Sequence, residues 1–484
     1  MNHQGDVVYG FALLSRGAAA ISGFGAMLAV ALSPAEALAQ TLTLRESLDT
    51  ALHNYGDIRA KQSRRDAAEH DVSYTRKSYL PDVVLSAQQT FGTVNALHGT
   101  LYSPGGPSNA STSLPLPEQN WNAAFGALYS VLVHWNVSTF GRLDRQIELS
   151  ERTHELKQRE LELARFQHGV RVTHAYLNLS TAQRITHIQK QSVARFEVVL
   201  ESVQSHAENG LVPGVDVSFA RAELANARSL QLKAYDAELL ASKELAVLMG
   251  VPFREFQLEP TFHQSTPESG EPAHVAPGHP VLAEHEGKVR RSEQEKKVAA
   301  AEGLPTLFAF GMLQGRGSGF RSNYAQDPGA FSSGYLGGVG IDRGNTLVGL
   351  GLSWNLASVL RSFSSEAARD ARTRALHQEQ ELVTQELVAQ ARFAEHKFDL
   401  AREVTHHAVL QRDAATEGFR QSKARYDSGL GTIVELTQAT FSATRADVDL
   451  ELAQNGIWQA LLLKSAAAGD LNEFLQQVRG VKKQ

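Results

Sequence analysis

NAAFGALYSVLVHWN (residues 122–136) and TLVGLGLSWN (residues 346–355) are the two stretches that decide the fold. In both, most alternate residues are bulky and apolar up to a tryptophan, Trp135 or Trp354, and most of the intervening residues are small or polar. This period of two predicts β-strands. A hairpin in a soluble core would also alternate. The alternation, however, is about as long as the roughly 10-residue strands that cross an outer membrane, and a terminal tryptophan suits the membrane interface.

Both stretches belong to a pattern that occurs twice in the chain. Short matching segments recur in the same order at separations of 219 or 224 residues. They are Tyr79-Leu80-Pro81 with Gly303-Leu304-Pro305, Trp135-Asn136 with Trp354-Asn355, Asn209-Gly210-Leu211 with Ser428-Gly429-Leu430, and Asp216-Val217 with Glu435-Leu436. Several such pairs at a nearly constant offset indicate an internal two-fold tandem repeat.

Each repeat is predicted to run helix, strand pair, very long helix, turn, helix. The first helical pattern extends from Leu44 to Tyr79 and ends before Pro81. The long helices, at about 141–208 and 357–427, contain no proline, and their apolar residues keep a spacing of three and four. The expected boundaries are 40–251 for the first repeat, 252–279 for a linker, 280–466 for the second repeat and 467–484 for a C-terminal tail. The strand pairs are expected at about 82–136 and 305–355, and the turns at about 209–215 and 428–432.

Residues 1–39 are interpreted as a secretory signal peptide. An uncharged run, GAAAISGFGAMLAVALS, lies between Arg16 and Pro34, and Ala37-Leu38-Ala39 follows it. This order of charged, apolar and small-x-small segments predicts cleavage after Ala39. An N-terminal membrane anchor is the alternative. With the signal interpretation, the mature chain begins near Gln40 in an exported compartment.

Composition and motifs exclude several classes of protein. The chain has 484 residues, 47 Lys plus Arg against 52 Asp plus Glu, and a formal charge of −5, so it lacks the basic excess of a nucleic-acid-binding protein. No cysteine is present to form a disulfide or a thiolate metal site. No HExxH motif, phosphate loop or local Ser-His-Asp arrangement is recognisable. We therefore expect no nucleic acid partner, no cofactor, no bound metal and no enzymatic activity.

Membrane strands would force the chain to assemble. Four strands leave two open edges, and unpaired backbone groups in hydrocarbon cost several kcal/mol each, so only a closed barrel is stable there. Because barrels have even strand numbers from eight upward, two, three or four chains would close one.

The whole mature chain resembles the TolC-like outer-membrane efflux protein family. The resemblance is carried by Leu80-Pro81 and Leu304-Pro305 at the strand starts, Trp135-Asn136 and Trp354-Asn355 at the strand ends, and ENGLVPGVDVSFARAEL (208–224) and YDSGLGTIVELTQA (426–439) at the helical turns. It implies an α+β membrane protein and a homotrimer in which twelve transmembrane strands form a barrel in outer-membrane lipid and twelve helices form an antiparallel helical barrel in the periplasm. It also implies a duct that docks, through a periplasmic adaptor, onto an inner-membrane pump.

The resemblance also assigns roles to residues at the turns. Glu435 corresponds to an acid that faces the pore, Asp216 to the acid of the network that closes the periplasmic end, and Tyr426 to its tyrosine. Gln438 lies at the same constriction, where it replaces a second pore acid. Gly431 stands where an arginine partner of Asp216 is expected, and Val215 replaces a polar residue, so the resemblance implies a single charged ring. For Asp216 and Glu435, the alternative is simple stabilisation of a helix N-terminus.

Two further sets of residues carry expected contacts. The resemblance makes Gly210-Leu211 and Gly429-Leu430 adaptor contacts, whereas the local interpretation is that glycine permits the chain reversal. Trp135 and Trp354 are expected at the membrane interface. A soluble periplasmic coiled-coil adaptor or scaffold is the main alternative function, but it gives the two aromatic-ended hairpins no role. An exported enzyme is the third possibility, and no site supports it.

Overall fold

The computed structural model describes residues 41–96, 114–263, 266–267 and 274–481. The chain divides into two units, Met1–Thr41 and Leu42–Gln484, and every helix and strand below belongs to the second unit. The predicted signal peptide, residues 1–39, lies outside the described residues. Of the helices in the described part, none has the length and apolar character needed to cross a membrane.

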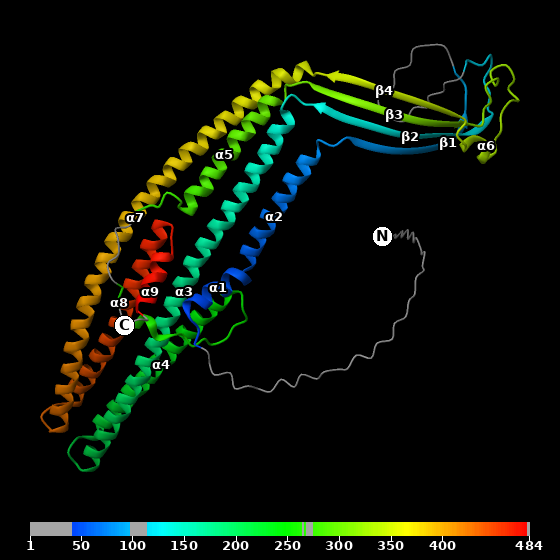
Figure 1. Ribbon diagram of the computed structural model, residues 1–484. Helices are drawn as coiled ribbons and strands as arrows, with labels where there is room; N and C mark the ends of the chain where they lie inside the picture. Colours follow the sequence, from blue (N-terminus) through cyan, green and yellow to red (C-terminus); the bar gives the residue numbers. More distant parts are fainter. Residues whose placement is uncertain (1–40, 97–113, 264–265, 268–273, 482–484) are drawn as a thin grey trace, which may run out of the picture. The chain divides into compact units, whose positions relative to one another are not determined.

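The order of elements is the same in both halves of the chain (Figure 1). The first half contains α1 (Leu44–Asn54), α2 (Gly56–Lys77), β1 (Asp82–Thr93), β2 (Ala123–Ser138), α3 (Arg142–Glu208) and α4 (Gly214–Met249). The second half contains α5 (Pro280–Ala301), β3 (Thr306–Ser318), β4 (Arg343–Ser353), α7 (Leu356–Asp427) and α8 (Ile433–Ala468). Three short elements are added, the 3-10 helix η1 (Pro260–His263), α6 (Tyr335–Val339) and α9 (Asn472–Val481).

The prediction of one continuous helix from Leu44 to Tyr79 is wrong. Tyr55 adopts an extended conformation and divides this segment into α1 and α2. The Tyr55 ring stacks on His168 of α3 with 3.9 Å between ring centroids, and the Arg171 guanidinium lies over the Tyr55 ring at 5.8 Å from its centroid. Packing against α3 therefore accompanies the break. The local helical pattern gave no sign of this tertiary contact.

The four strands form one antiparallel sheet in the order β1-β2-β3-β4. The register places the alternating apolar residues of all four strands on one face, and we call this the apolar face. It carries Val83, Leu85, Val131, Val133, Leu313, Val348, Leu350 and Leu352. The opposite face, which we call the polar face, carries Gln88, Ser130, His134, Gln314 and Asn345. It also carries apolar side chains, Val84, Leu128, Leu132, Met312 and Leu347, and Phe308 and Phe310 cover Gly351 and Gly349 there. In the described sheet β1 and β4 are the outer strands.

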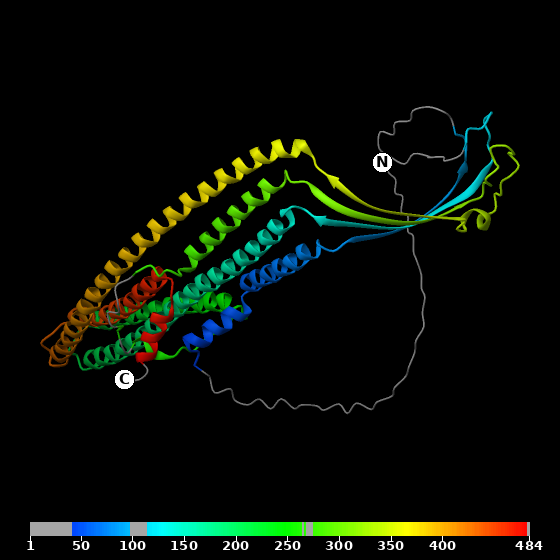
Figure 2. The same cartoon turned by 45° about the horizontal axis from the view of Figure 1, so that its top comes forward.

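The helices pack lengthwise on one another. α3 lies along α2, α4, α5 and α8, and α7 lies along α5 and α8. Figure 2 shows the same neighbours from a second direction. The fully buried Trp458 of α8 contacts Phe262 of η1 and Phe474 of α9, both edge-on, and Phe262 also contacts Tyr176 of α3. The linker and the C-terminal tail thus join helices that come from both halves.

The two repeated tryptophans hold the junction between helix and strand. The indole N–H of Trp135 donates to the carbonyl of Tyr79 at 2.9 Å, and that of Trp354 donates to the carbonyl of Gly303 at 3.0 Å. Each acceptor lies two residues before the proline that precedes a strand. In each repeat, the segment before the first strand therefore supplies the acceptor of one hydrogen bond, and the Trp-Asn segment supplies its donor. Both rings remain more than 40% exposed, so they are still available to an interface.

Replacing either tryptophan with phenylalanine removes this hydrogen bond and keeps an aromatic ring. We expect Trp135→Phe and Trp354→Phe each to lower stability by about 1 kcal/mol, measured as the midpoint of heat-induced loss of helical circular dichroism in detergent. Trp121→Phe is the matched control, since Trp121 is 80% exposed and lies outside the helices and strands. A midpoint shift no larger than that of the control would contradict the role of the indole N–H.

Candidate gate at the two helical turns

The α3–α4 and α7–α8 turns have the same backbone geometry. Gly210 and Gly429 both have φ of +72°, a value that glycine adopts without strain. The amide of Gly210 donates to the carbonyl of Ala207 and that of Leu211 to His206, and the amides of Gly429 and Leu430 make the equivalent bonds to Tyr426 and Arg425. This pair of bonds is the Schellman motif that ends many helices. The glycines thus have a structural role in each turn.

The leucines of the two turns point into solvent. Leu211 is 71% exposed and Leu430 is 74% exposed. The residue after the glycine of a Schellman motif often packs back on its own helix, but these two do not. Both turns lie at the same end of the helices (Figures 1 and 2). They therefore present two exposed apolar side chains at that end.

Tyr426 joins the two helical pairs just above the turns. Its ring, only 3% exposed, lies in an apolar cluster whose members come from all four helices. The buried members are Val199 and Val203 of α3, Ala220 of α4, and Ile433 and Leu436 of α8. Since Tyr426 itself belongs to α7, it links the second pair to the first.

The hydroxyl of Tyr426 is buried in a negative environment. Within the described part of the chain, no group forms a hydrogen bond with it. Burial raises the pKa of Tyr426, and the negative charges of Asp216 and Asp427 raise this pKa further. The charge of Asp216 thus acts on Tyr426, but the described structure does not join the two side chains by a hydrogen bond.

Glu435 is held by the start of its own helix. Its amide donates to Thr432 Oγ1 at 3.2 Å, and its carboxylate accepts from the Thr432 amide at 3.4 Å, which makes a capping box. The guanidinium of Arg425 lies 4.0 Å from the same carboxylate. Arg425 also donates to the Leu430 carbonyl at 3.3 Å. Glu435 is therefore a helix-capping residue whose charge is partly offset by a neighbouring cation, and its side chain remains 57% exposed.

Gln438 lies one turn further along α8 and is exposed. It lines a groove between α4 and α8 together with Phe219, Glu223, Val434, Thr437, Phe441, Ser442 and Arg445. Val215, two residues into α4, is also exposed. Glu435 and Gln438 thus occupy successive turns of α8.

Sequence reasoning missed Arg425 and Thr432. Arg425 lies six residues before Gly431, the position where an arginine was expected, and no local pattern marks it as the partner of Glu435. The capping box was visible as Thr-x-x-Glu at 432–435. Gly431 itself has little room, because a Cβ there would lie 3.2 Å from the backbone nitrogen of Tyr426.

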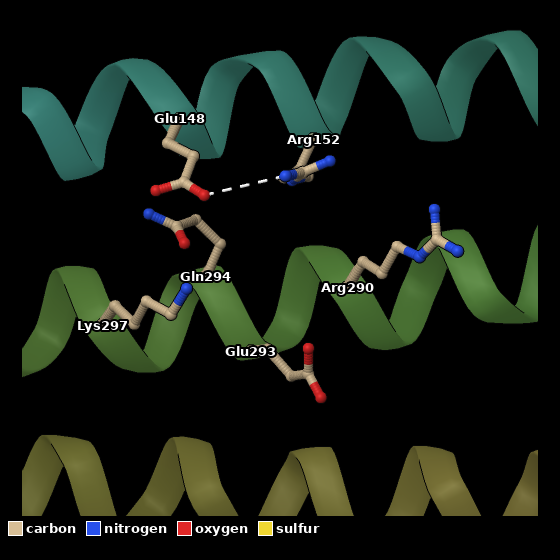
Figure 3. A pocket seen from close by; sticks show the side chains of 6 residues that line it. All are labelled: Glu148, Arg152, Arg290, Glu293, Gln294 and Lys297. Atoms are coloured by element: carbon tan, nitrogen blue, oxygen red, sulfur yellow. Dashed lines mark ion pairs between the residues drawn. The ribbon is translucent and has the colours of Figure 1, made fainter.

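A separate pocket between α3 and α5 has a different character (Figure 3). Its lining residues are Glu148, Arg152, Arg290, Glu293, Gln294 and Lys297, and Arg152 pairs with Glu148 at 3.7 Å. Ligand sites are mostly apolar with a few polar groups, whereas this lining is almost entirely charged. It provides no support for a site that recognises a small organic molecule.

Comparison with known proteins gives a family and a fold. The model of the outer membrane efflux protein family matches residues 47–251 and 276–468. No curated protein sequence matches the chain. Among solved structures, the Campylobacter jejuni CmeC outer membrane channel is similar at 14% identity and a TM-score of 0.69, covering 90% of this chain and 89% of CmeC. The CusC channel is similar at 12% identity and a TM-score of 0.69, covering 88% of this chain and 92% of CusC. The open state of the Neisseria gonorrhoeae MtrE outer membrane channel is similar at 16% identity and a TM-score of 0.67, covering 88% of this chain and 89% of MtrE.

Thr432→Ala removes the side-chain cap of α8. We expect the first turn of α8 to lose about 1 kcal/mol of local stability, measured as faster hydrogen exchange of the amides at 434–436. Ser218→Ala, at an exposed serine near the start of α4, is the control. Unchanged exchange in Thr432→Ala would show that the capping box does not stabilise this end of the helix.

Proposed function

Because the chain belongs to the outer membrane efflux protein family, we propose that it is the exit duct of a tripartite efflux or type I secretion system. The proposed duct lies in the outer membrane of a Gram-negative bacterium and extends into the periplasm. The observation that carries the proposal is the sheet, which combines an exposed apolar face with two outer strands that have no partner strand in the described chain. A periplasmic scaffold would leave that face in water.

Closure of the sheet requires other copies of the chain. The backbone groups along β1 and β4 need partners in hydrocarbon, where each unpaired group costs several kcal/mol. In the proposed homotrimer, β1 of one copy pairs with β4 of the next, and three chains of four strands give a barrel of twelve. Two or four chains would also give an even number, so the choice of three follows the resemblance to the family.

The helices also carry surface that a second copy would cover. Many large apolar side chains of α7 are exposed although α7 packs on α5 and α8. They include Leu356, Leu360, Phe363, Phe393, Leu400, Val404 and Leu410. Spacings of three, four and seven residues place several of them on one stripe. This stripe suits packing against a neighbouring helical rod in the trimer.

Mass and shape in detergent test the assembly. We expect light scattering to give about three times the mass of the mature chain. Negative-stain images should show a stalk on the order of 100 Å, because α3 alone has 67 residues at about 1.5 Å each. The same preparation should form channels in a planar bilayer. A compact monomer that needs no detergent would favour the scaffold instead.

The two exposed turns are the proposed contacts with the adaptor. Gly210-Leu211 and Gly429-Leu430 repeat one geometry at the same end of the helices. An adaptor with matching apolar positions would find two equivalent contacts in each chain, and six in a trimer. The inner-membrane pump would then select the cargo, because a wide aqueous duct makes few specific contacts with what passes through it.

The same end of the helices is the proposed gate. Glu435 would ring the constriction, Gln438 would lie one turn away, and Asp216 with Tyr426 would hold the two helical pairs together in the closed state. Three carboxylates in a narrow bore attract cations. Arg425, 4.0 Å from Glu435, lowers the net negative charge of each unit in this ring.

Charge changes at the gate should alter cation block in opposite directions. Glu435→Gln should raise the half-blocking concentration of a divalent cation about fivefold, the factor for ~1 kcal/mol of lost attraction, whereas Arg425→Gln should lower it. Block is measured as the fall in conductance in a planar bilayer. Glu208→Gln, at the exposed end of α3, is the control. Equal sensitivity in all variants would remove Glu435 from the constriction and leave the fold unaffected.

A further inference from the structure

An uncharged segment between β3 and β4 folds back onto the sheet. Residues 335–341 read YLGGVGI and comprise α6 and the two residues that follow it. The segment contacts β2 and β3, the two inner strands. Such composition is unusual in a loop beyond a sheet, where polar residues are the rule. Its position on the sheet indicates what it does.

The segment lies on the apolar face. The side chain of Ile341 lies over Gly315, such that a Cβ there would be 3.1 Å from Ile341 Cδ1. Gly315 is two residues beyond Leu313 and opposite Tyr129, so it shares the face of Leu313 and Val131. On this face, the residues of β3 and β4 at this level are glycines, Gly315, Gly317 and Gly344.

Close backbone packing holds the segment in place. A Cβ on Gly317 would overlap the carbonyl oxygen of Gly340, and a Cβ on Gly338 would overlap that of Phe125. Glycine is therefore needed at 317 and 338 for the segment to lie flat on the strands.

The segment also satisfies two polar side chains of the apolar face. The Tyr335 hydroxyl donates to Gln89 Oε1 at 2.8 Å, and Gln89 Nε2 donates to the Tyr129 hydroxyl at 2.8 Å. That hydroxyl donates to the carbonyl of Val339 at 3.1 Å. Without the segment, Gln89 and Tyr129 would be left to face hydrocarbon with fewer partners, which is costly.

The apolar residues of β4 by themselves do not reach the height of a membrane. From Leu352 to Val348, β4 advances four residues, about 14 Å along the strand and about 10 Å across a bilayer at the usual tilt. The apolar band of such barrels is about 25 Å tall. Beyond Val348 the same face of β4 continues with Thr346 and Gly344, so the band ends early there.

The outer side of the segment supplies the missing apolar surface. Leu336 is 84% exposed, a fraction similar to the 86% of Val348 on the strand, and Ile341 and Tyr335 are also exposed. These side chains continue the apolar face past the glycines of β3 and β4.

We propose that residues 335–341 are part of the lipid-facing surface, where Leu336 and Ile341 contact acyl chains of the outer leaflet. This inference rests on the proposed function, since it requires the sheet to be a membrane barrel. The segment extends the apolar band over β2 and β3, next to the short apolar run of β4. The segment packs on the inner strands β2 and β3, and its Tyr335 hydroxyl also reaches Gln89 of β1, whereas closure uses the open edges of β1 and β4.

Single cysteines test this directly, because the natural chain has none. Leu336→Cys is the test position. Leu350→Cys, on the apolar face of β4, reports whether the sheet lies in lipid, and Asn345→Cys, on the polar face, is the water-facing control. Each variant is labelled with bimane, checked for the native oligomeric mass and reconstituted into vesicles. Emission is compared with lipids that carry brominated acyl chains and with iodide added to the water.

We expect brominated lipid to quench the label at 336 and at 350 by a similar factor, and iodide to quench only the label at 345. Quenching at 350 but not at 336 would overturn the inference and leave the membrane barrel intact. Quenching at neither position would overturn the proposed function and the inference with it. If Leu336→Cys does not assemble, Ile341→Cys replaces it with the same expected result.

Discussion

The backbone groups along β1 and β4 impose the main physical constraint on this chain. A four-stranded antiparallel sheet with one exposed apolar face has no stable free form in water or in lipid, because water rejects the apolar face and hydrocarbon rejects the open edges. Assembly of several chains into one barrel resolves both conflicts. In the proposed trimer, closure of the barrel meets this requirement, and residues 335–341 are proposed to belong to the same lipid-facing surface.

The tandem duplication supplies the four strands and the helical pairs by using one structural unit twice. Each repeat contributes a hairpin, a long helical pair and a turn, and each fixes the passage from helix to strand with the same tryptophan hydrogen bond. The two turns likewise share one Schellman geometry. Both turns carry an acid at the matching position, Asp216 or Glu435, and they differ in that only the second has Arg425, Tyr426 and a capping threonine, Thr432.

Much of the fold was predictable because its signals are local and long. Period-two alternation ending at Trp135 and Trp354 predicted strands, and proline-free apolar spacing predicted α3 and α7. The break at Tyr55 was not predictable, because the aromatic ring that accompanies it stacks on His168, more than a hundred residues away in the chain. At the candidate gate, the sequence indicated the turn residues, but the pairing of Arg425 with Glu435 depends on how α7 and α8 leave the turn.

The sequence by itself determined the element order, the duplication and the alternation of the strands, since periodicity and repeated motifs depend only on neighbours along the chain. Only the tertiary structure decided which residues from distant parts of the chain contact one another. It placed Tyr426 in a cluster built from four helices, gave each repeated tryptophan its acceptor, and laid the uncharged segment at 335–341 over glycines of β3. Those contacts depend on the register and packing of distant segments, where the absence of a single Cβ decides how closely two backbones approach.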